Sequence, residues 1–516
     1  MHVSKSLRIR TLALLLACTL AGCVQLEPRP DLADERALPA GDDSPLDHAI
    51  AAAEDQHAGD SAFRLLIEGT EAFAVRAQSV RMARRSLDIQ TYIWHADLTG
   101  MFFAHELLEA ADRGVRVRLL IDDLDARAKS AGFAALAAHS NVDVRIFNPF
   151  ASRAGTLRFV SEGVRSFGRI NRRMHNKSWI ADNRLAVVGG RNIGDEYFGA
   201  SDEVNFVDLD FAMIGPIVRD ASASFDAYWN APSAYPIEVL DEPSVSSSAL
   251  ERLRAVLAEH SEKAENSPYA VTLREDDAIR RLVAGDWPLE WSAHYRFIVD
   301  DPLKITMKQQ DAQRSVVGAA LGQLARSAQR SLTVISPYFV PGEAGTERLI
   351  ELASGGRSIR VLTNSLAAND VAAVHGGYSR YREPLLRGGV HLWELKPLDG
   401  GSAESSFFGS SGASLHTKAL TADRTIAFVG SYNLDPRSTW LNCEQGVLVE
   451  SAALAEQLEA IFANQIEAQR AWSVALKDGQ LSWSDGATSF DSDPEASFGR
   501  RFQAWLARVL HVDAQL

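Results

Sequence analysis

Hydrophobic and polar positions follow two alternating patterns along the chain from about residue 62 onward. Apolar residues recur at helical spacing over Ala72–Arg85 and Met101–Asp112, and short runs of β-preferring residues occupy Ser86–Tyr92 and Val115–Ile121. Helices that alternate with short apolar strands are typical of crossover units, in which helices cover a mixed or parallel sheet. The pattern therefore predicts an α/β fold.

The same order of elements returns in the second half of the chain. The matching helical and strand patterns lie at Val316–Ala328, Ser331–Ser336, Thr346–Ser354 and Ile359–Asn364. A pattern that repeats at this scale indicates a duplicated unit. The sequence therefore predicts two tandem α/β domains, each a mixed sheet flanked by helices, at 62–235 and 290–500. A connector at 236–289 and a C-terminal helix at 501–516 complete the predicted division.

The first 22 residues have the pattern of an export signal. Basic residues up to Arg10 precede an apolar stretch at 12–20, which is shorter than the roughly 20 residues that span a bilayer. The segment Leu20-Ala21-Gly22-Cys23 then resembles the lipobox of bacterial lipoproteins, which implies an acyl anchor on Cys23. An ordinary signal peptide with a chance cysteine is the alternative. The acidic, proline-containing residues that follow, up to 61, are predicted to be a flexible tether.

This pattern also predicts where the protein resides. A lipid anchor on Cys23 would hold it at the cell envelope, on the periplasmic side of a membrane, and Val24 in place of an aspartate favours the outer membrane. No second apolar run approaches the roughly 18 residues of a membrane-spanning helix. Of the three cysteines, only Cys443 lies beyond the anchor, so no intramolecular disulfide is expected.

Net charge narrows the choice of partners. Lysine and arginine total 53 against 67 aspartates and glutamates, and 53 − 67 gives a net charge of −14. A protein whose main task is to bind nucleic acid usually needs a basic surface. Nucleic acid is therefore not a predicted partner, although a local basic pocket for a phosphate group is compatible with this balance.

Two segments with matching spacing carry the candidate chemistry. From each histidine, a lysine follows at +2, an aspartate at +7, a glycine at +14 and an asparagine at +17. The motif residues are His175, Lys177, Asp182 and Asn192 in the first segment and His416, Lys418, Asp423 and Asn433 in the second. Apolar runs on both sides of each aspartate predict two strands joined by a tight turn at 182–183 and at 423–424.

The residue types in each segment suit a phosphate group. Residues i and i+2 of an extended strand point to the same face, so histidine and lysine project together. Lysine supplies a positive charge for phosphate, and asparagine donates hydrogen bonds to an oxyanion, which makes Asn192 and Asn433 candidate phosphate-binding residues. Asp182 and Asp423 are expected to face away from the pocket and to fix the turn.

Duplication would bring both motifs to one active site shared by the two domains. Two histidines suit phosphoryl transfer through a covalent intermediate, because a neutral histidine can attack phosphorus while a protonated one donates a proton to the leaving oxygen. Lysines and asparagines would hold the charge on the phosphate oxygens. This chemistry requires no metal and no cofactor. A single motif of this kind is often only an exposed polar face, and two copies with equal offsets argue against that alternative.

These segments resemble the duplicated HxKxxxxD motifs of the phospholipase D superfamily, over nearly all of the chain from residue 62. Within the superfamily the chain is most similar to bacterial cardiolipin synthases, particularly the C type, through residues 87–94, 189–198 (GGRNIGDEYF) and 433–438 (NLDPRS). Other cardiolipin synthases begin with two membrane helices, whereas this chain has the lipobox-like segment instead.

The resemblance implies an enzyme that makes cardiolipin from phosphatidylglycerol and a second phospholipid, with phosphatidylethanolamine as the candidate donor. It also implies that His175 is the nucleophile and His416 the acid and base, although the roles could be exchanged. Superfamily members have a carboxylate that orients each histidine. Position ahead of a following strand assigns Glu444 to His416 and Asp208 to His175, with Glu203 as the competitor of Asp208.

Three other functions stay open at this point. Capture of the same intermediate by water would give a hydrolytic phospholipase D that releases phosphatidic acid. A nuclease of the same superfamily is disfavoured by the acidic charge and the anchor. A non-catalytic envelope protein that binds phosphate would not need both motifs intact. Phospholipids and a membrane are the predicted partners, and the sequence is silent on protein partners.

Three further features have both a structural and a functional interpretation. Asp122 and Asp123 end a strand and could hold Mg²⁺, although a polar strand end is favoured. Arg172 and Arg173 could attract anionic head groups or form a solvated edge. The segment 369–381, which includes His375, could contact a head group or pack on a helix face.

Overall fold

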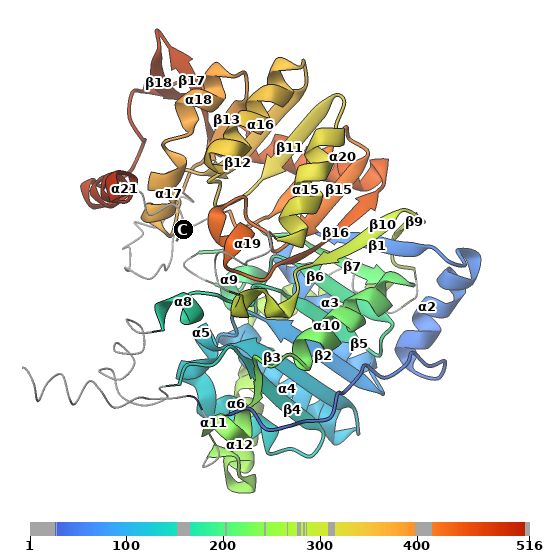
Figure 1. The fold of residues 1–516 in the computed structure, drawn as a ribbon. Coiled ribbons are helices and arrows are strands. Elements are labelled where there is room, and N and C mark those ends of the chain that lie inside the picture. Colours follow the sequence, from blue (N-terminus) through green and yellow to red (C-terminus); the bar gives the residue numbers. More distant parts are fainter. Residues whose placement is uncertain are drawn as a thin grey trace, which may run out of the picture.

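The computed structural model describes residues 26 and 28–510, apart from 152–165, 202–203, 242–243, 266, 276–279, 282–283, 285, 308–314 and 398–414. Within these residues the chain forms two mixed β-sheets, each flanked by helices, that lie one above the other in Figure 1. The predicted α/β fold is confirmed. The proposed signal peptide, Cys23 and Glu203 lie outside the described residues.

The first sheet, over the described residues, has nine strands in the order β8-β4-β3-β2-β5-β6-β7-β1-β9. Its strands are β1 (Ser61–Leu66), β2 (Ser86–Thr91), β3 (Arg116–Asp122), β4 (Val142–Phe147), β5 (Ser178–Ala181), β6 (Leu185–Gly189), β7 (Asp210–Ile214), β8 (Ala234–Pro236) and β9 (Glu290–Ser292). Strands β2, β3 and β4 are parallel, and the run from β5 through β6 and β7 to β1 is antiparallel.

The second sheet has ten described strands in the order β10-β16-β15-β14-β11-β12-β13-β17-β18-β19. They are β10 (Tyr295–Val299), β11 (Ser331–Ile335), β12 (Ser358–Asn364), β13 (His391–Leu395), β14 (Ala419–Ala422), β15 (Ile426–Gly430), β16 (Gln445–Glu450), β17 (Ala471–Lys477), β18 (Gln480–Ser484) and β19 (Ser489–Phe490). The parallel core β11-β12-β13 and the antiparallel run from β14 to β10 repeat the first sheet strand for strand. This shared topology confirms the predicted duplication.

Helices cover both faces of each sheet (Figure 1). In the first half they are α2 (Pro45–Gln56), α3 (Gly69–Met82), α4 (Leu98–Asp112), α5 (Asp123–Ala126), α6 (Ser130–Ala137), α8 (Phe167–Ile170), α9 (Asp195–Phe198), α10 (Ile217–Trp229), α11 (Ile237–Asp241), α12 (Ser247–Glu265) and α13 (Pro268–Glu275). In the second half they are α15 (Val316–Ser327), α16 (Gly342–Ser354), α17 (Ala372–Tyr378), α18 (Arg382–Arg387), α19 (Pro436–Trp440), α20 (Ala452–Gln465) and α21 (Phe498–Leu510). Short 3₁₀ turns lie at Arg127–Lys129 and Pro302–Thr306.

The two hairpins that carry the motifs have the predicted tight turns. Asp182 and Asn183 have φ of 51° and 53°, and Asp423 and Arg424 have φ of 55° and 59°. Two successive residues of positive φ join antiparallel strands with the right-handed twist that the flanking strands require, and Asp and Asn tolerate this region better than most residues. The same turn therefore positions β5 against β6 and β14 against β15.

One hydrophobic cluster is shared by the two domains and fixes them against each other. Phe63, Val188 and Phe211 of the first domain pack in the same buried group as Val429 and Val447 of the second. Apolar surface buried on both sides stabilises the interface by roughly 25 cal/mol per Å². The site between the domains is therefore built on a packed core.

The prediction of a flexible tether is wrong for the described residues ahead of β1. Glu35 forms an ion pair with Arg145, and α2 places Leu46 and Ile50 in the buried core of the first domain. Ser44 caps α2 by accepting from the N–H of Asp47, and the carboxylate of Asp47 accepts from the N–H of Ser44 and from Arg85. The sequence analysis missed this packing because the segment has no long run of regularly spaced apolar residues. Two buried apolar residues and a few ion pairs are enough to hold it on the first domain.

The structure also refines the outer limits of the second domain. Strand β9 pairs with β1 of the first sheet, so the chain enters the second domain after Ser292 rather than at 290. The C-terminal helix begins at Phe498, and residues 511–516 lie outside the described residues. Among the helices that the structure describes, none combines the length and the apolar character needed to cross a membrane.

Candidate active site

Two short parallel bridges bring the motif segments together between the domains. The bridges join Met174 to Cys443 and Val207 to Leu415. Each bridge continues into a backbone hydrogen bond of the histidine that follows. The N–H of His175 donates to the carbonyl oxygen of Cys443 at 2.9 Å, and the N–H of His416 donates to the carbonyl oxygen of Val207 at 2.9 Å. Each histidine is thereby fixed by the opposite domain.

The orienting carboxylates are exchanged between the domains. Nδ1 of His175 lies 2.9 Å from Oε2 of Glu444, and Nδ1 of His416 lies 2.5 Å from Oδ2 of Asp208. Both predicted carboxylates are therefore at the site, but the predicted pairing of Glu444 with His416 and of Asp208 with His175 is wrong. Glu203, the competitor, lies outside the described residues.

The interdomain bridges explain the exchange. Glu444 and Asp208 lie just ahead of β16 and β7, each beside the hairpin of its own domain. The bridges, however, run from the segments ahead of these strands to the histidine segments of the other domain. The prediction paired each carboxylate with the histidine of its own motif, because it used only positions along the chain. Such positions cannot reveal a partner that the other domain supplies.

Both histidines present Nε2 rather than Nδ1 to the pocket. Nδ1 of His175 faces two acceptors, the carboxylate of Glu444 and, at 3.1 Å, the carbonyl oxygen of Ser431. Two acceptors at one nitrogen require that Nδ1 carries the proton. The neutral ring then has its lone pair on Nε2, which is the atom a nucleophile needs. Asp208 imposes the same arrangement on His416.

Aromatic side chains pack on both imidazoles. The ring of Tyr92 meets His175 edge to face at a centroid distance of 5.1 Å. His416 lies against Tyr197 at 5.3 Å and stacks on Phe206 at 5.4 Å. These contacts restrict rotation of the rings and remove water from them. The sequence analysis did not identify these aromatics as partners of the histidines, although Tyr92 is the last residue of the predicted strand 86–92.

The two lysines are buried beside the histidines. Nζ of Lys177 donates to the carbonyl oxygen of His175 at 2.6 Å, and Nζ of Lys418 donates to that of His416. Burial lowers the pKa of Lys177 to about 7 and that of Lys418 to about 8, although Glu444 and Asp208 oppose the shift. The charge of Lys418 also acts to lower the pKa of Lys177, as expected for two motifs that lie at one site.

Both histidines are neutral near pH 7. Burial lowers the pKa of His175 to about 4 and that of His416 to about 4, and the nearby lysine charges act in the same direction. Burial acts to raise the pKa of Glu444, but His175 and the hydroxyl of Ser431 outweigh it and keep that pKa below its ordinary value. An ionised carboxylate and a neutral imidazole therefore face each other until an anion binds.

We expect kcat/KM to fall as the pH rises through about 7 to 8, the pKa values of Lys177 and Lys418. A lysine is charged below its pKa and neutral above it, so the pocket loses the positive charge that holds a phosphate. On the acid side, activity should be lost only near pH 4, where the histidine that acts as nucleophile gains a proton and its Nε2 loses the free lone pair. Rates measured from pH 4 to 10 test this expectation.

The exposed Lys263 provides a control for this profile. Lys263 pairs with Glu259 on α12, far along the chain from the pocket. Its replacement in Lys263→Ala should leave the pH profile unchanged. A profile of the unmodified protein that stays level to pH 10 would show that neither buried ammonium group is required.

The two asparagines lie at the ends of the motif hairpins, but they are not equivalent. Asn192 accepts from the N–H of Ile93 at 3.3 Å and donates through Nδ2 to the hydroxyl of Tyr197 at 2.8 Å. The backbone N–H of Asn433 donates to the hydroxyl of Ser438, and its buried Oδ1 has no hydrogen-bond partner among the described residues. Asn192 thus also links the first hairpin to an aromatic neighbour of His416.

The motif aspartates face away from the pocket, as the sequence analysis expected. The carboxylate of Asp182 accepts hydrogen bonds from the backbone N–H groups of residues 84, 85 and 86 at 2.9, 2.7 and 3.0 Å. Asp423 accepts from those of residues 329, 330 and 331 at 2.8, 2.6 and 2.9 Å. Each aspartate therefore ties the hairpin turn to the loop ahead of the neighbouring strand, β2 in the first sheet and β11 in the second.

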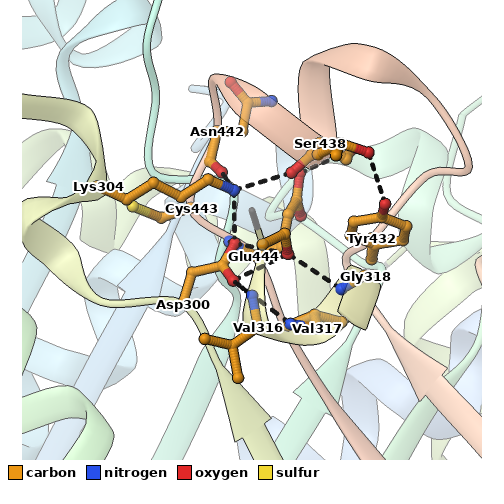
Figure 2. Close-up of polar contacts among 12 residues, drawn as sticks. Asp300, Lys304, Val316, Val317, Gly318, Tyr432, Ser438, Asn442, Cys443 and Glu444 are labelled. Atoms are coloured by element: carbon orange, nitrogen blue, oxygen red, sulfur yellow. Dashed lines mark hydrogen bonds and ion pairs between the residues drawn. The ribbon is translucent and has the colours of Figure 1, made fainter. Parts of the chain in front are cut away.

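A buried network of polar side chains fixes the position of Glu444 (Figure 2). Its Oε1 accepts from the hydroxyl of Ser438 at 2.9 Å, and its Oε2 accepts from Ser431 at 2.5 Å. Its backbone N–H donates to Asp300 at 3.2 Å, and Asp300 also accepts from the ammonium of Lys304 at 2.8 Å. The sequence analysis missed this network because Asp300 and Lys304 lie far from the motif along the chain.

Asp300→Asn is expected to lower the free energy of unfolding by about 3 kcal/mol, because Lys304 would keep its buried charge without an ionised partner. Displacement of Glu444 by a fraction of an ångström is expected to reduce kcat as well, by up to about 100-fold. Urea unfolding and steady-state rates measure the two effects. Asp301→Asn is the matched control, because Asp301 is exposed and caps only a 3₁₀ turn.

The remaining candidates take structural roles. Asp122 accepts from the N–H of Met174 at 2.9 Å and from Arg173 at 3.2 Å, so it supports the His175 segment as a polar strand end. Arg173 is fully buried, and Arg172 is buried and donates to carbonyl oxygens of the 304–307 turn. Neither arginine forms the solvated edge that was considered, and these contacts leave no sign of a head-group site.

His375 belongs to a separate buried cluster on α17. His375 and Glu394 lie near Asp493 in a set of metal-ligand type, but Arg382 pairs with Glu394 at 3.0 Å and with Asp493 at 2.7 Å. A guanidinium between two carboxylates supplies the positive charge that a cation would otherwise bring. The cluster therefore fastens α17 and α18 to the segment after β19.

The arrangement of these side chains indicates which reaction the pocket can perform. Two imidazoles offer Nε2 atoms whose opposite nitrogens are held by carboxylates, and two buried ammonium groups supply positive charge. This arrangement suits attack on a phosphodiester by one histidine and proton transfer by the other. Carboxylate–histidine pairs of this kind fix the tautomer and stabilise the imidazolium when it forms.

Comparison with known proteins agrees with this chemistry. The family profile described as "Cardiolipin synthase, PLD-like domain" matches residues 77–229 and 321–466. The chain is 40% identical to cardiolipin synthase C of Escherichia coli over 89% of this chain and 97% of that protein. It is 26% identical to cardiolipin synthase A of Pseudomonas syringae over 80% of this chain and 70% of that protein.

Uncharacterised and structurally known proteins extend the comparison. A protein of Helicobacter pylori is 32% identical over 87% of this chain and 88% of its own length. The crystal structure of phosphatidylserine synthase from Haemophilus influenzae superposes with a TM-score of 0.58 at 12% identity, and covers 90% of this chain and 99% of that one. At this identity the superposition supports the fold alone.

Proposed function

This chain belongs to the cardiolipin synthase family of phospholipase D-like proteins, and from that premise we propose that it joins a phosphatidyl group to phosphatidylglycerol to form cardiolipin. The protein is a phospholipid phosphatidyltransferase. The observation that supports the proposed reaction is the pair of histidine–carboxylate contacts made across the domain interface, each beside a buried lysine.

The proposed reaction has two displacements at phosphorus. Nε2 of His175 attacks the phosphodiester of the donor lipid, a P–N bond forms, and the P–O bond to the head group breaks. His416, protonated, gives its proton to the departing oxygen. The primary hydroxyl of phosphatidylglycerol then transfers its proton to His416 while its oxygen attacks phosphorus, and the P–N bond breaks. Both histidines return to their initial states.

The charged groups of the pocket support this sequence of steps. Burial and the charges of Lys177 and Lys418 lower the pKa of His416, and an anionic phosphodiester beside the two lysines neutralises their charge and offsets that part of the effect. A bound anion therefore favours the protonated form that the general acid needs. Asn192 and Asn433 are proposed to donate to the phosphate oxygens, whose charge is shared with the lysines.

Phosphatidylethanolamine is the proposed donor, and ethanolamine is then the leaving group. If phosphatidylglycerol served as donor instead, glycerol would leave by the same steps. Water in place of the lipid hydroxyl would release phosphatidic acid. The side chains of His175 and His416 are 9% and 15% exposed, so the site admits little bulk water before substrate binds, which favours transfer over hydrolysis.

The protein is further proposed to act at the cell envelope, anchored by acylated Cys23 on the periplasmic side of a membrane. The lipobox-like segment 20–23 supports this location. Cys23→Ala should leave an uncleaved precursor that carries no acyl chain. Metabolic labelling with a fatty acid tests the anchor directly, and label that remains on the variant would contradict it.

A lipid product assay tests the proposed reaction. The purified protein is incubated with phosphatidylglycerol in detergent or vesicles, with and without phosphatidylethanolamine, and the products are identified by mass. Cardiolipin whose yield rises when phosphatidylethanolamine is added is the expected result. Phosphatidic acid with free head group and no cardiolipin would replace the transferase by a hydrolase.

A further inference from the structure

Helix α21 presents an apolar face to solvent. The exposed large apolar side chains of this helix, between 39% and 85% exposed, are Phe498, Phe502, Trp505, Leu506, Val509 and Leu510. Four of them recur at i, i+4, i+7 and i+11, which places them along one side of the helix. The rings of Phe502 and Trp505 stack at a centroid distance of 5.8 Å. They form a continuous apolar stripe that we call the α21 stripe.

The opposite side of the helix is fastened to the protein, which fixes the α21 stripe outward. Arg500 is buried and donates to the carbonyl oxygens of Leu366 and Asn369. Ala504 packs so closely on α17 that a Cβ at Gly376 would lie 2.3 Å from its carbonyl oxygen. The outward orientation is therefore set by specific packing on the inner side.

The charge of α21 differs from that of the chain as a whole. Residues 498–510 contain Arg500, Arg501 and Arg508 and no acidic residue, whereas the whole chain has a net charge of −14. Basic side chains beside exposed aromatic and aliphatic residues are typical of helices that lie in the interface of an anionic bilayer. The combination gives the helix charge complementarity to lipid head groups.

The inner side of α21 also contacts a segment that lies close to the catalytic groups. Asn369, which accepts from Arg500, precedes Asp370, and the charge of Asp370 acts on the pKa of Lys418 in the pocket. In Figure 1, α5 and α8 of the first domain lie on the same side of the molecule as α21. They carry two further exposed apolar side chains, Leu124 and Phe167.

We propose that the α21 stripe inserts into the interfacial layer of an anionic phospholipid bilayer and holds the pocket against the membrane surface. Trp505 and the phenylalanines would lie at the level of the head groups and upper acyl chains, with Arg508 at the phosphates. The inference concerns binding, and it stands whichever phospholipid reaction the pocket performs.

A second copy of the chain is a poorer occupant of this surface. The described helix of 13 residues is about 20 Å long at 1.5 Å per residue. A stripe of that length and roughly 10 Å width offers about 200 Å², whereas a stable interface buries about 800 Å² on each partner. A bilayer needs no complementary protein surface beyond the stripe.

Photocrosslinking at position 505 tests the proposal in the full chain. The photoreactive residue p-benzoylphenylalanine replaces Trp505, and the protein is illuminated on vesicles of phosphatidylglycerol and phosphatidylethanolamine. The matched control carries it in place of Val256, which is 52% exposed against 55% for Trp505 and lies on α12 at the opposite end of the molecule in Figure 1. Any other membrane anchor is present in both variants and does not distinguish them.

The expected result is a phospholipid adduct on the peptide that contains position 505, at least tenfold more abundant than at position 256. The adduct at 505 should fall severalfold on vesicles of phosphatidylcholine, which lack net charge. Equal adducts at the two positions, or an adduct at 505 that joins two protein chains, would overturn the proposal.

A pair of substitutions separates this inference from the proposed reaction. Phe502→Ser with Trp505→Ser is expected to raise the KM for long-chain lipid in vesicles at least fivefold and to leave turnover of short-chain, monomeric phospholipid unchanged. Val256→Ser is the control and should change neither. A KM for vesicle lipid that does not move would contradict the role of the stripe. Absence of cardiolipin from the unmodified protein would refute the reaction alone, since the crosslink requires no chemistry in the pocket.

Discussion

Replacement of His175 by alanine is expected to lower kcat by about 10⁴-fold or more, because the variant lacks the atom that forms the covalent bond to phosphorus. A donor labelled in its phosphate should label the unmodified protein during turnover, and acid-labile label on a histidine identifies the intermediate. His175→Ala should lose both the activity and the label. The measurement is the rate of cardiolipin formation together with protein-bound phosphate after a rapid quench.

His416→Ala distinguishes the two histidines. It should also lose turnover, but a donor whose leaving group needs no proton, such as a nitrophenyl phosphodiester, should still label His175. The label should then persist, because no base activates the acceptor hydroxyl. Label that disappears in His416→Ala and remains in His175→Ala would exchange the two roles. Full activity in both variants would refute the two-histidine mechanism.

Glu444→Gln is expected to lower kcat by about 10²- to 10⁴-fold with little change in KM. The amide keeps the size of the side chain but no longer stabilises an imidazolium or a fixed tautomer of His175, and the loss of the corresponding carboxylate in a serine protease triad has an effect of this order. Glu450→Gln is the matched control, because Glu450 ends the same strand with its side chain exposed. Steady-state kinetics on both variants measure the difference.

A double-mutant cycle tests which histidine Glu444 serves. If the carboxylate acts through His175, the loss in Glu444→Gln should nearly vanish in a His175→Ala background and remain in an Asp208→Asn background. The contact at 2.9 Å between Glu444 and His175 predicts that outcome. A loss of equal size in both backgrounds would contradict the exchanged pairing. The residual rates are low and the His175→Ala background forms no label, so cardiolipin measured by mass after long incubation is the suitable readout.

Much of the site follows from local patterns in the sequence. The equal offsets from His175 and His416 predicted both hairpins, their turns and the outward-facing aspartates, because these features depend on residues close together in the chain. The order of helices and strands likewise predicted the duplicated α/β fold. Such features are set by backbone geometry and by side chains that alternate between the two faces of a strand.

Other features depend on contacts between distant segments and have no local signal. The assignment of Glu444 to His175 requires the bridge between Met174 and Cys443, which no spacing reveals. The role of Asp300 in holding Glu444 follows from the meeting of β10, α15 and the loop after α19. In the same way, the sequence predicted a C-terminal helix, but only its packing on α17 shows which side faces outward.

The exchange of Glu444 and Asp208 between domains bears on how such a protein could arise. Neither domain alone holds a complete histidine–carboxylate pair, so a single-domain ancestor with this geometry would have worked only as a two-fold symmetric dimer, in which each subunit lent its carboxylate to the other. Fusion of two such copies into one chain preserves both histidine–carboxylate pairs, and the two pairs need no longer consist of identical residues. One pair here has a glutamate and the other an aspartate. After fusion, the halves could therefore specialise, one toward bond formation and the other toward proton transfer, while each still depends on the other.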